Sequence, residues 1–204
     1  MADLVIAAAQ ATSIGGDIAA NVAEHSRFIA AAGDLGVQLL VFPELSLTGY
    51  EPAIARARTL APDDTRLDPL RNLAAGLRMA VVAGAPIPSE NGRCRLAAFA
   101  FLPDGSVSTY TKEYLHSGEE VFFEPGGGGD LLRIGGEAVA LAICADASHP
   151  RHAARAASRG ASVYAAGVLI TEKGYAADAA LLERYATQHS MTVMMANYAA
   201  QTGG

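Results

Sequence analysis

The stretch Ala138-Val-Ala-Leu-Ala-Ile-Cys144, followed by Ala-Asp-Ala-Ser-His-Pro150, decides the fold class of this 204-residue chain. An unbroken apolar run of this length predicts a strand buried on both faces. Pro150 favours the start of a helix soon after the strand ends. A strand that leads into a helix is typical of α/β proteins, whose ligands bind at the carboxyl ends of strands. The stretch therefore places Cys144 where a ligand is expected.

Short apolar runs alternate with longer helical patterns along the rest of the chain. Turn sequences at Glu90-Asn91-Gly92 and Asp104-Gly105 predict an antiparallel meander. This mixture of pairings, with helices outside, implies one α/β domain in which two sheets stack face to face under helices. The expected strands are residues 4–10, 37–42, 80–85, 96–102, 107–111, 131–134, 138–144, 162–167 and 192–197, and the expected helices are 17–33, 65–78, 150–159 and 176–189.

Composition excludes several classes of protein. Hydrophobic residues make up 51% and charged residues 18% of the chain, a balance that excludes disorder. A net charge of −6 without a basic run argues against a nucleic-acid partner. No apolar stretch approaches the ~18 residues of a membrane span, and no basic, apolar leader opens the chain. With two cysteines and no disulfide framework, a cytoplasmic location is expected.

Lysine is unusually rare. Only Lys112 and Lys173 occur among the 15 basic residues, and the others are arginine. A lysine that persists in such a chain indicates a position that arginine cannot fill. Lys173 is interpreted as an ordinary surface residue, which leaves Lys112 as the candidate.

Three residues that could carry chemistry each stand at the end of an expected strand. Taken singly, Cys144 fits an inert buried thiol as well as a reactive one, whereas Glu44 is interpreted as a loop or capping carboxylate and Lys112 as an exposed strand-end ammonium. Taken together, they supply a nucleophile, a base for its proton and a cation for an oxyanion, the groups needed to attack a C–N bond. Cys94, at a hairpin turn, lacks such a setting and is interpreted as structural.

Longer motifs surround these three residues. They are Phe42-Pro-Glu-Leu-Ser-Leu-Thr-Gly-Tyr50, Tyr110-Thr-Lys112 with Leu115 and Gly118-Glu119, Phe122-Phe-Glu-Pro-Gly126, and Ile143-Cys-Ala-Asp146 with Pro150 and Gly160-Ala161. In this order along the whole chain, the motifs resemble those of the nitrilase or carbon–nitrogen hydrolase superfamily. The pairs Ala9-Gln10 and Ala196-Asn197 also match the pattern of this superfamily.

The resemblance implies a four-layer α-β-β-α sandwich that forms homo-oligomers, with residues 1–204 as one carbon–nitrogen hydrolase domain. It implies that Glu44 is the general base, Lys112 the oxyanion-stabilising lysine and Cys144 the nucleophile. The backbone N–H of Ala145 is expected to be a second oxyanion donor. Relatives usually continue past the point where this sequence ends, so C-terminal strands are expected to be missing from it.

The remaining substrate contacts are less sharply defined. A second glutamate after the lysine is expected to orient the substrate or the lysine; Glu119 fits, and Glu120 is the alternative. Tyr50 is the candidate aromatic contact, although core packing is the commoner fate of such residues, as it is for Tyr164 and Tyr175. Many relatives carry an aromatic residue where this chain has Ala145.

Neither a metal nor a cofactor is expected. His149 and His152 form a His-x-x-His pair at a helix start, but a metal needs three or four ligands and the spacing supplies no others. The pair is therefore interpreted as solvated or capping. The glycine run at residues 126–129 lacks the Gly-Lys-Ser/Thr ending of a phosphate loop.

The expected activity is hydrolysis of a small amide through a thioester on Cys144, and the expected partner is a small amide or nitrile. A nitrilase and an N-carbamoyl amide hydrolase are the alternatives within the enzyme class. From a different class, a catalytically silent binding module with the same fold remains open.

Overall fold

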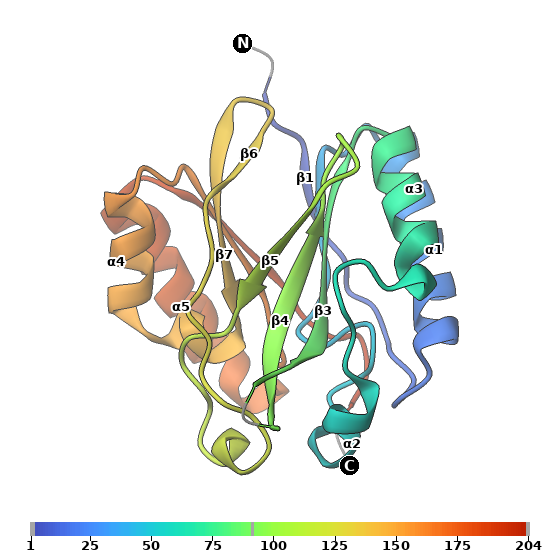
Figure 1. The fold of residues 1–204 in the computed structure, drawn as a ribbon. Helices are drawn as coiled ribbons and strands as arrows, with labels where there is room; N and C mark the ends of the chain where they lie inside the picture. Colours follow the sequence, from blue (N-terminus) through green and yellow to red (C-terminus); the bar gives the residue numbers. More distant parts are fainter. Residues whose placement is uncertain (1–2, 91, 203–204) are drawn as a thin grey trace.

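Two β-sheets stand face to face between two pairs of helices in the computed structural model, which describes residues 3–90 and 92–202 (Figure 1). Helices α1 (Ile18–Asp34) and α3 (Asp68–Gly76) cover one sheet. Helices α4 (Pro150–Ser158) and α5 (Glu172–His189) cover the other. The four-layer sandwich expected from the sequence is confirmed. Among the described residues, no helix is both long and apolar enough to cross a membrane.

The first sheet joins parallel and antiparallel strands. Its order is β1-β2-β3-β4-β5, in which β1 pairs with β2 and β2 with β3 in parallel. Strands β3, β4 and β5 form the expected antiparallel meander, although Asn91 of its first turn lies outside the described residues. The strands are β1 (Ile6–Ala8), β2 (Leu39–Val41), β3 (Ala80–Pro88), β4 (Cys94–Phe101) and β5 (Val107–Thr111).

The second sheet has the order β6-β7-β8-β9. Strands β6 and β7 form a hairpin, and β7, β8 and β9 run parallel. The strands are β6 (Leu132–Ile134), β7 (Glu137–Ile143), β8 (Val163–Gly167) and β9 (Thr192–Ala196). Strand β7 is the run quoted at the outset, and Cys144 follows it directly.

Each central strand is buried on both faces, as the unbroken apolar runs predict. Along β7, Val139 and Leu141 point into the layer between the two sheets, whereas Ala140 and Ala142 point toward the helices. Because side chains alternate across a strand, a strand between two layers needs apolar residues at every position. Small residues on the helix side let α4 and α5 approach the sheet closely.

Three helical segments differ from the sequence prediction. The expected helix 65–78 begins as a 3-10 turn (Thr65–Leu67), where Asp64 accepts a hydrogen bond from the Arg66 N–H, and continues as α3. Helix α5 starts before residue 176 because Thr171 caps it. The short helix α2 (Pro52–Ala55) and its 3-10 extension (Arg56–Arg58) were not predicted, since a single turn shows no periodicity.

Two glycines, one from each sheet, leave room for the backbone of the segment after β2 to run close to both sheets. A Cβ atom on Gly84 of β3 would lie 2.3 Å from the backbone nitrogen of Leu45, and one on Gly167 of β8 would lie 2.6 Å from the carbonyl oxygen of Phe42. The Gly84 carbonyl also accepts a hydrogen bond from the Leu47 N–H at 2.9 Å. These contacts fix the backbone on both sides of Glu44.

We expect Gly84→Ala to destabilise the fold by about 1–3 kcal/mol, because the added methyl has no room against backbone atoms. Urea denaturation measures the change. Gly76→Ala is the matched control: a Cβ there meets nothing within 4 Å, and the helical position predicts a gain of up to ~1 kcal/mol. Equal denaturation midpoints for Gly84→Ala and the wild type would show that the backbone at Leu45 can shift away from the added methyl without loss of stability.

Candidate active site

The three candidate residues follow three different strands and meet at one place. Glu44 lies after β2, Lys112 immediately follows β5, and Cys144 immediately follows β7. The Lys112 side chain is fully buried, and its Nζ donates to Glu44 Oε1 at 2.7 Å. Nζ also donates to Glu119 Oε1 and Oε2 at 2.9 and 2.8 Å. The reading of Lys112 as an exposed strand-end residue is therefore wrong.

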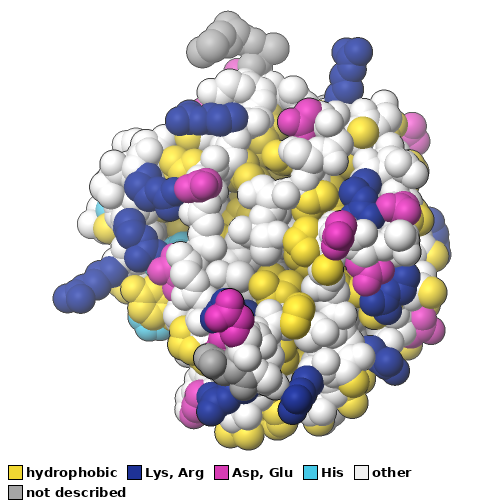
Figure 2. Space-filling model, viewed as in Figure 1, with side chains coloured by type: hydrophobic (Ala, Val, Ile, Leu, Met, Phe, Trp, Pro, Cys, Tyr) yellow, Lys and Arg dark blue, Asp and Glu magenta, His cyan; other side chains and the backbone are white. Residues whose placement is uncertain are grey.

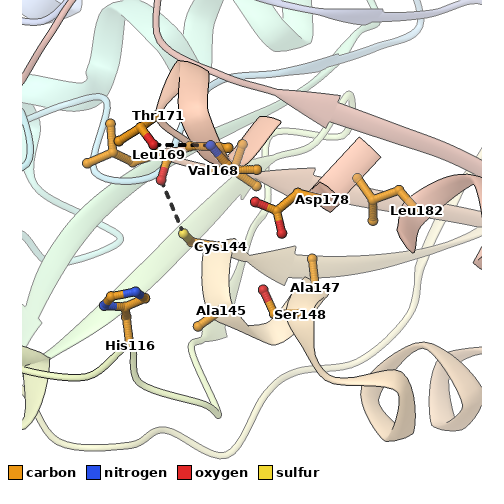
Figure 3. A pocket seen from close by; sticks show the side chains of 12 residues that line it. His116, Cys144, Ala145, Ala147, Ser148, Val168, Leu169, Thr171, Asp178 and Leu182 are labelled. Atoms are coloured by element: carbon orange, nitrogen blue, oxygen red, sulfur yellow. Dashed lines mark hydrogen bonds between the residues drawn. The ribbon is translucent and has the colours of Figure 1, made fainter. Parts of the chain in front are cut away.

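Cys144 occupies a strained turn. Its φ is +44°, in the left-handed region that side chains other than glycine rarely adopt, and it opens a 3-10 turn (Cys144–Ser148). The thiol donates to the carbonyl oxygen of Leu169 at 3.6 Å, and Figure 3 shows the sulfur pointing that way, away from the turn. The turn thus projects the sulfur out of the sheet instead of burying it between strands.

Burial and charge together set the protonation of the three groups. Burial opposes the charge of Lys112, but the nearby Glu44, Cys144 and Glu119 outweigh it and raise the Lys112 pKa. Burial raises the pKa of Glu44, against the lowering effect of Lys112. Burial also raises the pKa of the Cys144 thiol, and the charge of Glu44 adds to this effect. The result is a charged ammonium next to a carboxyl and a thiol that each hold a proton more tightly than usual.

Of the two glutamates that could orient the lysine, Glu119 lies at the site. Glu119 is buried against Lys112, whereas Glu120 is exposed and accepts a hydrogen bond from the Gly118 N–H. Glu119 Oε1 also accepts from the Tyr50 hydroxyl at 2.9 Å, and Oε2 accepts from the His116 N–H at 2.8 Å. These bonds fix the carboxylate that holds Lys112.

Tyr50 reaches the site through Glu119. Burial, followed by the charge of Glu119, raises the pKa of the Tyr50 hydroxyl, so it remains a hydrogen-bond donor. Of the other two tyrosines considered, Tyr164 is buried in the core and Tyr175 is 49% exposed.

Asp146 is a buried residue whose contacts the sequence did not reveal. Its Oδ1 accepts from the N–H groups of Glu113 and Tyr114 at 3.0 and 2.9 Å, just after Lys112. Its Oδ2 accepts from the Ile143 N–H at 3.0 Å, just before Cys144. One carboxylate therefore joins the chain beside the lysine to the chain beside the thiol.

The prediction that His149 and His152 are solvated or capping is wrong for His152, whereas half-buried His149 does stand at the N-cap position of α4. His152 is buried, with Nε2 2.8 Å from the Tyr110 hydroxyl and Nδ1 2.7 Å from the Tyr164 hydroxyl. His149 occupies the first position before α4, but its ring nitrogen bonds to the carbonyl of Ala145 at 2.7 Å and caps no helical N–H. Both sets of partners come from packing between distant segments, which the spacing of two histidines does not show.

A cavity of about 300 Å³ opens beside Cys144 (Figure 3). Ala145 and Tyr50 were both predicted to contact the substrate. Ala145 lines this cavity, whereas Tyr50 does not. No group of three or more potential metal ligands occurs within residues 3–90 and 92–202. On the face seen in Figure 2, acidic and basic side chains are interspersed, so no continuous basic patch forms there.

Comparison with known proteins identifies the family. The carbon–nitrogen hydrolase family model matches residues 5–203, and the chain belongs to this family. A nitrilase of Pyrococcus abyssi (strain GE5 / Orsay) is 30% identical over 71% of this chain, and a glutamine-dependent NAD(+) synthetase of Rhodobacter capsulatus is 29% identical over 78% of it. The chain spans only 57% and 29% of the lengths of these two relatives.

Solved structures of an amidase from Nesterenkonia sp. AN1 share the fold. A mutant in complex with butyramide has a TM-score of 0.89 at 27% identity, covering 98% of this chain and 78% of the other. Another mutant, with the acetamide moiety of fluoroacetamide added covalently at the active site cysteine, has the same TM-score, identity and coverage. The fold of this chain is thus that of the nitrilase superfamily.

A second buried histidine, His25, supports the segment that carries Glu44. Its Nδ1 donates to the Asn21 carbonyl at 2.7 Å, and its Nε2 accepts from the Ser46 hydroxyl at 2.9 Å. The ring stacks on Phe42 with 3.9 Å between centroids. Burial lowers the pKa of His25 to about 4.

Because the unfolded chain protonates His25 more readily, the stability from neutral His25 is fully present above about pH 6.5 and is lost as pH falls toward 4. We expect this histidine to contribute a fall of about 3 kcal/mol in the free energy of unfolding across that window. Urea denaturation at pH 7 and pH 4 tests it: the fall shrinks in His25→Gln but not in the control His189→Gln. An equal fall in all three proteins would remove His25 as the cause.

Proposed function

We propose that this chain is an amidase that hydrolyses small aliphatic amides through a thioester on Cys144. The observation that carries the proposal is the Lys112 ammonium, held between the carboxylates of Glu44 and Glu119 close enough to the Cys144 thiol for all three charges to act on it. Acrylamide and butyramide are bound by the structurally similar Nesterenkonia amidase, which supports a small amide as the substrate.

The first half-reaction forms the thioester. Glu44 takes the thiol proton, the sulfur of Cys144 attacks the amide carbonyl carbon, and the carbonyl π electrons move to oxygen. Lys112 and the N–H of Ala145 stabilise the oxyanion. As the tetrahedral intermediate collapses, the C–N bond breaks, and the proton held by Glu44 passes to the leaving nitrogen, which departs as ammonia.

The second half-reaction releases the acid. Glu44, again a carboxylate, takes a proton from water as the water oxygen attacks the thioester carbon. The C–S bond then breaks, and the proton returns from Glu44 to the sulfur. Glu119 acts as a positioning residue, since both of its carboxylate oxygens accept hydrogen bonds from the Lys112 ammonium.

We expect the wild type to release ammonia from acetamide and butyramide, and Cys144→Ala and Glu44→Gln to abolish that release. Lys112→Arg should lower kcat roughly 10²- to 10³-fold, the usual cost of losing an oxyanion donor, because the planar guanidinium does not reproduce a compact ammonium. A coupled ammonia assay measures each variant, and circular dichroism confirms that it is folded.

The same assay with nitriles and N-carbamoyl compounds tests the alternatives, of which the nitrilase is supported by the Pyrococcus relative. Iodoacetamide labelling followed by peptide mass mapping tests the silent binding module. Preferential modification of Cys144 over the buried Cys94 supports an enzyme. An unreactive Cys144 in folded protein, with no ammonia from any substrate, would contradict the proposal.

The pH dependence should follow Glu44. Activity requires its carboxylate form, and burial raises its pKa, so kcat/KM for butyramide should rise with a midpoint above the ordinary value of 4.5. Because the pKa of Lys112 is raised as well, the ammonium persists at alkaline pH. Initial rates between pH 4 and 10 measure the profile. A midpoint at or below 4.5 would show that another group limits the reaction.

A further inference from the structure

The cavity beside Cys144 contains a carboxylate that the proposed mechanism does not use. Asp178, a half-buried residue in the middle of α5, lines the same cavity as the thiol, and Figure 3 shows its carboxyl group extending from the helix toward the space beside Cys144. Within the part of the chain that the structure describes, Asp178 makes no hydrogen bond and no ion pair. A carboxylate that faces a cavity and has no partner is free to pair with a ligand group of complementary charge.

The walls of the cavity leave Asp178 accessible. Gly174, one turn earlier on α5, also lines the cavity, and a Cβ atom there would lie only 3.5 Å from Asp178 Oδ2. Across the cavity the 3-10 turn after Cys144 contributes Ala145, Ala147 and Ser148, all of which have small side chains (Figure 3). A volume of about 300 Å³ is at the lower end for small-molecule sites and suits a substrate with a short chain.

The charge balance of the cavity favours a cation. Among the described residues, no lysine or arginine lines it, and its only other titratable side chains besides Asp178 are Cys144 and His116. The ammonium whose charge acts on the thiol is that of Lys112, and its three protons are already directed at Glu44 and Glu119. An anionic substituent would therefore meet Asp178 without compensation, whereas a cationic one would form an ion pair with it.

We propose that Asp178 selects amides whose acyl chain carries an ammonium group. The acyl group is the part that stays on Cys144 through both half-reactions, so an ion pair with Asp178 holds it during attack by the thiol and during attack by water. This inference rests on the proposed amidase function and adds a substrate class to it: short amino-acyl amides in preference to neutral amides of equal size.

Matched pairs of substrates test the selection. Glycinamide and propionamide, β-alaninamide and butyramide, and 4-aminobutyramide and pentanamide differ within each pair by an ammonium in place of a methyl. A hydrogen-bonded ion pair predicts a preference of roughly 10- to 100-fold in kcat/KM for the ammonium member of at least one pair. Asp178→Asn should bring that ratio to about one, whereas Glu183→Gln, at an exposed acidic position on the same helix, should leave it intact.

Two results would overturn the inference. One is a wild type without preference in any pair, and the other is an Asp178→Asn variant that slows both members of a pair by the same factor. Binding to Cys144→Ala, measured by calorimetry, separates this failure from failure of the amidase proposal. If neutral amides are hydrolysed without preference, only the inference fails. If no amide is hydrolysed but Cys144→Ala binds the ammonium member more tightly and Cys144→Ala/Asp178→Asn does not, only the amidase proposal fails.

Discussion

The arrangement of this protein depends on a buried ammonium between two buried carboxylates. Moving an ion out of water costs several kcal/mol even after the surroundings relax. The charged side chain of Glu44, Lys112 or Glu119 would therefore be unfavourable in the interior without the other two. With all three Nζ protons directed at carboxylate oxygens, the cluster offsets that cost. Removing the lysine would leave two uncompensated carboxylates, which makes the cluster a constraint on the fold as well as on the chemistry.

The two sheets satisfy this constraint by bringing separate strand ends to one point. Gly84 and Gly167 let the segment before and after Glu44 touch both sheets, while Asp146 connects the backbone after Lys112 to the backbone before Cys144. The glycines do this by allowing backbone atoms to approach closely, and Asp146 does it by accepting hydrogen bonds from backbone N–H groups. Strand ends held in this way keep the three side chains in position relative to one another.

The sequence predicted the strands well because strands buried on both faces leave an unbroken apolar signal, as in β7. It also predicted that Glu44, Lys112 and Cys144 end their strands. Each residue taken singly allowed an ordinary interpretation, and it was their combined chemistry, followed by the family resemblance, that pointed to one site. Glu119 and Glu120 could not be separated, because their loop has no periodicity. The turn that starts at Gly118, with φ at +95°, directs Glu119 inward and leaves Glu120 exposed. The contacts of Asp146 and His152 depend on tertiary packing and left no local signal.

Burial, and after it the negative charge of the cluster, raises the pKa of the Cys144 thiol. Two carboxylates and one ammonium leave a net charge of −1 in a buried region, so a thiolate formed by loss of the proton to solvent would add a second uncompensated negative charge. In the proposed mechanism, transfer of the proton from Cys144 to Glu44 moves the negative charge instead of creating one. Lys112 would then be released from one carboxylate at the moment when a new anion forms on the substrate oxygen. A lysine suits this exchange better than an arginine, since its three equivalent protons on a compact centre can be redirected without moving a rigid planar group.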